Sequence, residues 1–380
     1  MSIASIKRKI SPWVKNFPGW RTDRKIVVIE SDDWGSIRMP SREVYEKCLK
    51  AGYRVDKIAY ERYDSLASED DLELLFELLS SFRDYKDNHP VITANSLVAN
   101  PDFKKIKDSG FREYHFELVT ETFKKYPKHS NALKLWEAGR RAGIFFQQSH
   151  GREHLNVSMF MDGLKRNDRD LIFGFNHEIP GIIPHGEIPA GGNTYVESLK
   201  YSNESDKQQK LQMIIEGLDL FERLFGYRSE TLIPPNYLWS PEFDEVVSQR
   251  GVNYYQGIRK MKEPKFNGSV SYHTHVLGEK NVWGQRYLVR NAHFEPALFK
   301  QKVTDPVDNC LKDIFAAFSL KKPAIICSHR INYVGFIDPG NRDRNLRMLK
   351  NLLTKIKKRW PEVEFMSSVQ LGKLITGKND

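Results

Sequence analysis

The chain has 380 residues, of which 40% are hydrophobic, 28% charged and 12% aromatic, and this balance excludes a disordered or fibrous protein. The formal net charge is +10, but Lys and Arg are interleaved with Asp and Glu, so we expect a solvated basic surface and no nucleic-acid partner. Cys48, Cys310 and Cys327 are widely spaced and match neither a disulfide framework nor a zinc ribbon. They favour a reducing, cytoplasmic compartment.

The first predicted unit is a basic N-terminal segment, residues 1–24, which mixes Lys and Arg with apolar side chains. It contains no apolar run of the kind found in a secretory signal, although it could contact a membrane surface peripherally. No part of the sequence reaches the length of about 18 apolar residues that a transmembrane segment needs. Residues 25–380 are expected to form a single domain.

Within that domain, short apolar runs rich in β-branched residues alternate with longer helical patterns. This alternation predicts an α/β fold with a mainly parallel sheet, a (β/α)7–8 barrel that is complete or one unit short. Residues 177–201 and 265–297 interrupt the pattern and are expected to be excursions over the barrel mouth, the second of them built from hairpins. The expected strands are 25–30, 90–94, 143–147, 171–175, 231–234, 252–256, 324–328 and 363–366, and the expected helices are 69–85, 131–142, 206–225, 241–250, 306–318 and 341–359.

Polar residues follow three of these strands directly, where a parallel barrel carries its active site. Asp32 and Asp33 end the first strand, and neighbouring side chains on an extended chain point in different directions, so one carboxylate can bind a metal while the other faces a water. His150 and His154 follow the third strand, and on a helix they would share one face and one divalent ion. His329 follows a late apolar strand and is suited to protonate a leaving group.

The order of these motifs resembles that of the polysaccharide deacetylases, carbohydrate esterase family 4. The resemblance implies a distorted barrel and a metal-dependent hydrolase that removes an acetyl group, bound through nitrogen or oxygen, from a carbohydrate. It implies that Asp33, His150 and His154 bind the metal, that Asp32 is the catalytic base and that His329 is the general acid. Zinc suits such a site best, with cobalt, nickel, manganese or magnesium as alternatives.

The chain departs from the family pattern at two places. Trp34 is inserted between the paired Asp residues and the Gly that usually follows them. The family's motif of Arg, any residue, Pro and an aromatic corresponds to residues 233–237, where the Arg is missing, and we expect Arg290 to supply the lost charge. The residues that we predict to contact the substrate are Trp34, Pro235, Asn236, Trp239, Arg290 and Asn332.

Three other functions remain open from the sequence. Residues 150–154 also match the inverted zinc-peptidase motif, in which Glu153 would be the base. A glycosidase on a similar barrel would pair Asp32 with a second carboxylate, and a non-catalytic barrel would only bind a glycan. The candidate second carboxylates are Glu178, Glu187 and Glu295. For the favoured deacetylase, a cytoplasmic location indicates a soluble or lipid-linked sugar intermediate of surface-glycan metabolism as substrate.

Overall fold

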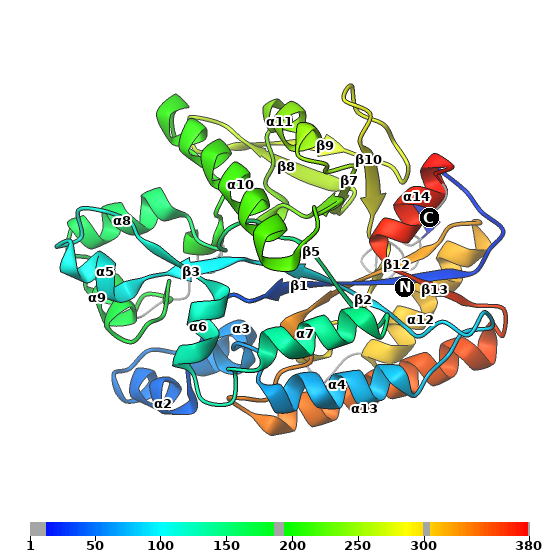
Figure 1. The fold of residues 1–380 in the computed structure, drawn as a ribbon, viewed down its shortest axis with the longest axis horizontal. Helices are drawn as coiled ribbons and strands as arrows, with labels where there is room; N and C mark the ends of the chain where they lie inside the picture. The colour runs from blue at the N-terminus through cyan, green and yellow to red at the C-terminus, as the bar shows by residue number, and fades with distance from the viewer. Residues whose placement is uncertain (1–12, 186–193, 299–304, 379–380) are drawn as a thin grey trace, which may run out of the picture.

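The computed structural model describes residues 13–185, 194–298 and 305–378 (Figure 1). Half of the predicted N-terminal segment, residues 1–12, lies outside the described residues, as does part of the excursion predicted at 177–201. No helix in the described ranges is long and apolar enough to cross a membrane.

The described chain is organised around a nine-stranded sheet in which the neighbouring strands pair in parallel. Eight strands follow one another in the order β10-β7-β6-β5-β2-β1-β12-β11, and β13 pairs with β1. The strands are β1 (Ile26–Trp34), β2 (Ile92–Ser96), β5 (Phe145–Ser149), β6 (Thr231–Leu232), β7 (Tyr254–Gly257), β10 (Arg286–Val289), β11 (Ala292–His293), β12 (Ala324–His329) and β13 (Glu364–Met366).

The two ends of this sheet are joined by a very short piece of chain. β10 lies at one end and β11 at the other, yet only Arg290 and Asn291 separate them in sequence. The backbone N–H of Arg290 donates to the carbonyl of Gly257 on β7, and that of Asn291 donates to Ile325 on β12. The sheet therefore curls until its edges meet, which confirms the predicted distorted barrel.

Helices cover the outside of the barrel, and both faces of strand β1 are buried against apolar side chains. Figure 1 shows α4 (Glu69–Ser80), α7 (Ala132–Arg141) and α13 (Pro339–Arg359) side by side along one flank, with α12 (Pro306–Ser319) near them. Val27 and Ile29 of β1 belong to the large core cluster beneath these helices. Ile26 and Val28 join a second cluster, which also draws residues from β7, β10, β12 and α14 (Ser368–Thr376). Burial on both faces is typical of a parallel strand.

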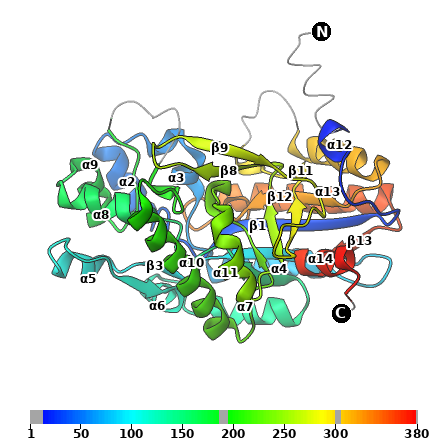
Figure 2. The same ribbon diagram turned by 90° about the horizontal axis from the view of Figure 1, so that it is seen from above.

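A group of helices lies beyond the carboxyl end of β1, over the barrel mouth (Figures 1 and 2). It consists of α2 (Arg42–Lys50), α3 (Ala59–Tyr63), α8 (Val157–Lys165) and α9 (Arg169–Asn176). Ile179 and Ile182, in the described part of the predicted excursion, pack against Tyr45 and Cys48 of α2. The longest helix, α10 (Glu204–Phe225), runs along the side of the barrel that α4 and α7 leave open.

Two predictions about secondary structure are wrong. Residues 171–175 form part of helix α9, because Asp168 caps its first turn by accepting hydrogen bonds from the N–H groups of Asp170 and Leu171. A short apolar run fits a buried helix turn as well as a strand. In the region 265–297, the hairpin of β8 (Lys260–Pro264) and β9 (Val270–Thr274) is present, but β10 and β11 are strands of the main barrel.

A buried ion pair ties the mouth helices to the barrel. Arg330, which follows β12, donates Nε and Nη2 to the two carboxylate oxygens of Asp64 at 3.0 and 2.9 Å, and Nη1 to the carbonyl of Ser36. Both side chains are fully buried. We expect Asp64→Asn to lower the free energy of unfolding by about 3–5 kcal/mol, because it leaves a buried guanidinium without its counter-charge.

Urea denaturation followed by circular dichroism measures that loss. The control is Glu46→Gln, which removes the partner of Arg42 in an exposed pair on α2 and should cost less than about 1 kcal/mol. A loss below about 1 kcal/mol for Asp64→Asn would show that the buried pair contributes no more than an exposed one.

Candidate metal centre and active site

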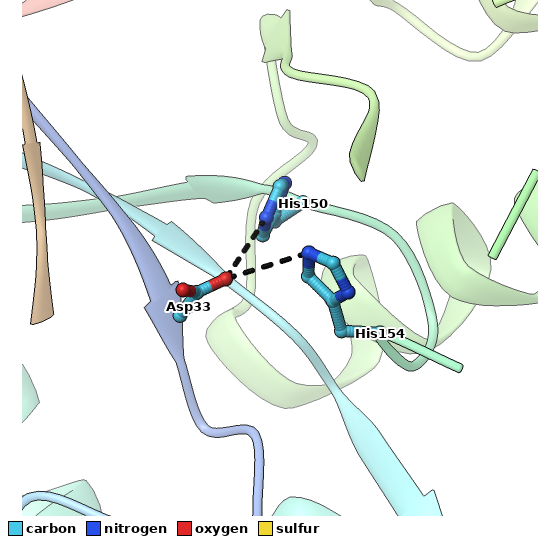
Figure 3. Close-up of side chains that lie close together, drawn as sticks. All are labelled: Asp33, His150 and His154. Carbon is cyan, nitrogen blue, oxygen red and sulfur yellow. Dashed lines mark ion pairs between the residues drawn. The ribbon is translucent and has the colours of Figure 1, made fainter. Parts of the chain in front are cut away.

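Asp33, His150 and His154 converge at the carboxyl ends of two strands (Figure 3). Oδ1 of Asp33 lies 3.5 Å from Nε2 of His150 and 3.5 Å from Nε2 of His154. All three side chains are buried. The sequence therefore predicted a set of ligand atoms that the fold does bring together.

The register of the sheet explains how Asp33 and His150 meet. β2 lies between β1 and β5, and its Ser96 pairs with Trp34 on one side and Ser149 on the other. Asp33 and His150 therefore leave the sheet at the same height. His154 was predicted to lie with His150 on one face of a helix, but residues 150–155 are not helical, and a loop carries His154 instead. Gly151, at φ 104°, turns the loop in a way that other residues rarely adopt.

The chemistry of these donors fits a divalent metal such as zinc. Nδ1 of His150 lies 2.9 Å from the carbonyl of Ile233, which can only accept, so Nδ1 carries the proton and Nε2 presents its lone pair to Asp33. Burial lowers the pKa of His154 to about 3, which keeps that ring neutral. Two atoms bound to one tetrahedral zinc stand about 3.4 Å apart, close to the spacing found here.

Asp32 is held beside this trio by Arg290. Two guanidinium nitrogens of Arg290 donate to the two carboxylate oxygens of Asp32 at 2.6 and 2.7 Å, and its Nε donates to Glu30. Asn95 donates a further hydrogen bond to Asp32. Burial acts to raise the pKa of Asp32, but the charge and hydrogen bonds of Arg290 outweigh it and lower the pKa to about 2. Arg290 therefore provides a buried positive charge beside Asp32 and fixes the orientation of its carboxylate.

His329 faces Asp32 from the neighbouring strand β12. Its Nε2 lies 3.6 Å from Oδ2 of Asp32, and its Nδ1 lies 2.6 Å from Oε1 of Glu295. Asn332 donates to the other oxygen of Glu295 at 2.7 Å. Burial opposes a charged ring, yet the carboxylate of Glu295 outweighs it and holds the pKa of His329 well above its usual value. His329 is therefore protonated at neutral pH and able to donate.

The role of Glu295 as the partner of His329 is not visible in the sequence. Glu295 follows β11, and His329 ends β12, so two adjacent strands present the pair. Glu295, Cys327 and His329 also form a second group of close potential metal ligands. This group suits a metal less well, because hydrogen bonds already engage Glu295 and burial raises the pKa of the Cys327 thiol.

These groups line a single cavity of about 310 Å³. Its lining includes Asp32, Asp33, His150, His154 and His329. A water or a carbonyl group in this cavity therefore has the metal-ligand trio, a carboxylate and a protonated imidazole within reach. Such a set can activate a water, polarise an acyl group and protonate a leaving atom.

The predicted substrate contacts are placed differently. Asn236 lines the cavity, whereas Pro235 and Trp239 border a separate small pocket. Trp34 is 1% exposed and packed in the core, so its ring cannot stack on a sugar. Trp239 is 5% exposed, and Asn332 is buried against Glu295. Trp34 and Trp239 therefore serve packing, and Arg290 is buried against its two carboxylates rather than turned toward the cavity.

Comparison with known proteins finds similarity only at the level of structure. No family model and no curated protein matches the sequence. A protein from Mycobacterium smegmatis assigned as a polysaccharide deacetylase is 9% identical, with a TM-score of 0.46, over 95% of this chain and 93% of the other. An allantoinase is 12% identical, with a TM-score of 0.46, over 94% and 93% of the two chains.

A protein from Pseudomonas aeruginosa, also assigned as a polysaccharide deacetylase, is 8% identical, with a TM-score of 0.41, over 92% of this chain and 91% of the other. Two of these three structures bear the name of the family whose motifs the sequence resembles, and their TM-scores are 0.46 and 0.41. These likenesses concern the fold alone.

Proposed function

We propose that the chain is a metal-dependent hydrolase that removes an acyl group, acetyl in the simplest case, from a nitrogen or oxygen of a carbohydrate. The observation that carries this proposal is the arrangement around one cavity: Asp33, His150 and His154 as a metal-ligand trio, with Asp32 and His329 beside it. Two imidazoles and one carboxylate make zinc the expected metal.

In the proposed reaction, Asp33, His150 and His154 would hold the metal, which when bound would acidify a water and polarise the acyl carbonyl. Asp32, ionised at neutral pH because its pKa is about 2, accepts the proton of the water as the water oxygen bonds to the acyl carbon. So weak a base is sufficient only for a water that is already acidic. His329 donates its proton to the departing nitrogen or oxygen as the acyl bond breaks, and Glu295 holds the ring in position.

The contacts of Glu153 argue against the hypothesis that the chain is a zinc peptidase with the inverted motif. Glu153 accepts two hydrogen bonds from Arg152, at 2.6 and 2.7 Å, and its side chain is 1% exposed. It does not line the cavity that holds the trio, so it cannot accept a proton from a water there.

For the glycosidase hypothesis, the two candidate second carboxylates that the structure describes are both engaged by other side chains. Glu178 accepts a hydrogen bond from the hydroxyl of Tyr126, and Glu295 is engaged by His329 and Asn332. The third candidate, Glu187, lies outside the described residues. A hydrolase of acyl groups uses the whole arrangement at the cavity, whereas a glycosidase would leave the trio without a role.

Replacing the base tests the proposed roles. We expect Asp32→Asn to lower kcat about 10³-fold, because the amide keeps the shape of the side chain but cannot accept the proton. The metal content should stay at the wild-type level, since Asp32 is not one of the ligands. Activity near the wild-type level in a folded, metal-loaded Asp32→Asn protein would assign the base to another residue.

Metal analysis combined with a substrate panel tests the function as a whole. Purified protein should contain one divalent ion per chain and release acetate from at least one N-acetyl or O-acetyl sugar or nucleotide sugar, and a chelator should abolish the release. As part of the proposal, we place the substrate among cytoplasmic intermediates of surface-glycan metabolism, which the three buried, unpaired cysteines support. Salt-sensitive glycan binding without any turnover would instead indicate a non-catalytic barrel.

A further inference from the structure

The cavity that contains the trio has a second, aliphatic part. Besides the polar groups at the strand ends, its lining comes from the mouth helices and from the described part of the excursion after α9. These lining residues carry branched aliphatic side chains: Ile58, Leu155, Ile179, Ile182, Ile183 and Val196. An acetyl group ends in a single methyl group, which needs no such surface.

The aliphatic part is firmly built. Ile179 and Ile182 belong to a buried cluster with Tyr45 and Cys48 of α2. The backbone N–H of Ile183 donates to Oε1 of Glu61 on α3 at 3.1 Å, which ties the excursion to the opposite side of the mouth. The wall is therefore held by packing and by hydrogen bonding from two directions.

The surroundings of the Glu61 carboxyl group indicate that this part of the cavity is poorly hydrated. It lies beside Ile183, and its Oε2 atom is buried without a hydrogen-bond partner among the described residues. Burial raises the pKa of Glu61 to about 7. A carboxyl pKa this close to 7 is expected where the surroundings are apolar and poorly hydrated.

The size of the cavity exceeds what an acetyl group requires. Its volume is about 310 Å³, whereas an apolar cavity of about 150 Å³ is enough to hold a benzene molecule. Resting on the proposed function, we propose that this site prefers, over acetyl, an aliphatic acyl chain of about six to ten carbon atoms, held against the isoleucine-rich wall.

A series of p-nitrophenyl esters tests this inference with the full-length, zinc-loaded protein. From acetate through butyrate and hexanoate to octanoate, kcat/KM should rise about fourfold per added methylene, because each methylene leaves water for the wall. A kcat/KM that is highest for acetate and falls with chain length would overturn the inference.

Variants that fill the cavity test whether the preference for longer acyl chains arises at the aliphatic wall. Ile183→Trp should lower kcat/KM for octanoate at least about tenfold more than it lowers kcat/KM for acetate, because the indole occupies space that only the longer chain uses. Val196→Phe, at a half-buried position, provides a second variant in case the first fails to fold. Val282→Trp is the control, since Val282 is 91% exposed. Equal losses on both esters for the two cavity variants would count against the inference.

Calorimetric titration with octanoate and with acetate separates the inference from the proposed function. We expect octanoate to bind at least about tenfold more tightly than acetate, and Ile183→Trp to remove the difference. Octanoate binding without hydrolysis of any ester would overturn the proposed function and support the cavity assignment. Acetate hydrolysis without any preference for longer chains, in binding or turnover, would overturn the inference alone.

Discussion

Replacing Asp33 with Ala is expected to strip the protein of its metal and to lower turnover at least about 10⁴-fold. Asp33 is the anionic member of the trio, and both imidazole nitrogens face its Oδ1 atom at 3.5 Å. Without it, two neutral rings remain as ligands, and a water near them keeps a pKa too high for neutral pH. Plasma mass spectrometry gives the metal content per chain, and ester hydrolysis gives the rate.

The matched control for this variant is Asp108→Ala. Asp108 lies at the end of α5 (Phe103–Asp108) in an exposed ion pair with Lys104. It should keep both metal and activity. If Asp33→Ala retains one metal ion per chain while Asp108→Ala behaves as wild type, the trio is not the metal site.

Arg290→Met is expected to lower the free energy of unfolding by about 3–5 kcal/mol. The Arg290 side chain is fully buried and forms ion pairs with both Glu30 and Asp32. Removing it leaves two carboxylates facing each other in a medium that solvates charge poorly. Turnover should fall as well, because Asp32 loses the two hydrogen bonds that orient it.

A double-mutant cycle in chemical denaturation checks this account. Glu30→Gln removes one of the two carboxylates and keeps the hydrogen bond from Ser368 to its side-chain oxygen. In the Arg290→Met background it should therefore restore part of the lost stability, at least about 1 kcal/mol. Purely additive losses would mean that Arg290 contributes packing and not charge balance.

The residues of the candidate site that could be predicted from the sequence share one property. A short apolar run precedes each of these residues within the same strand or just before its end, so a local pattern marks both the strand and its end. The residues are Asp32, Asp33, His150 and His329. In a parallel sheet these ends meet at one edge, which makes the convergence predictable without knowledge of the pairing. His154 was predicted for a different reason, helical spacing, although a loop turned by Gly151 brings it to Asp33.

The parts that could not be predicted depend on contacts between distant segments. Arg290 was expected as a replacement charge and as a substrate contact, and Glu295 was not expected as the partner of His329. Arg290 lies on the piece of chain between β10 and β11, and Glu295 follows β11, so their positions become apparent only once these two strands are placed at opposite ends of the sheet. Trp34 shows the converse error: an aromatic residue next to a motif suits core packing as well as substrate binding, and burial decided between them.

The aliphatic part of the cavity was equally hidden. The segment that contains Ile179, Ile182 and Ile183 was predicted as a loop because its glycines and prolines interrupt any periodic pattern. Its isoleucines acquire a role only when Glu61 of α3 and the helix α2 hold the segment across the barrel mouth. Wall residues of this kind come from three separate stretches of the chain, and none of them carries a motif.

An anomalous difference map, collected from crystals of the zinc-loaded protein at the zinc absorption edge, tests the central claim most directly. The account predicts one strong peak, bounded by Oδ1 of Asp33 and the Nε2 atoms of His150 and His154. A peak between Glu295, Cys327 and His329 instead, or no peak beside Asp33, would contradict it.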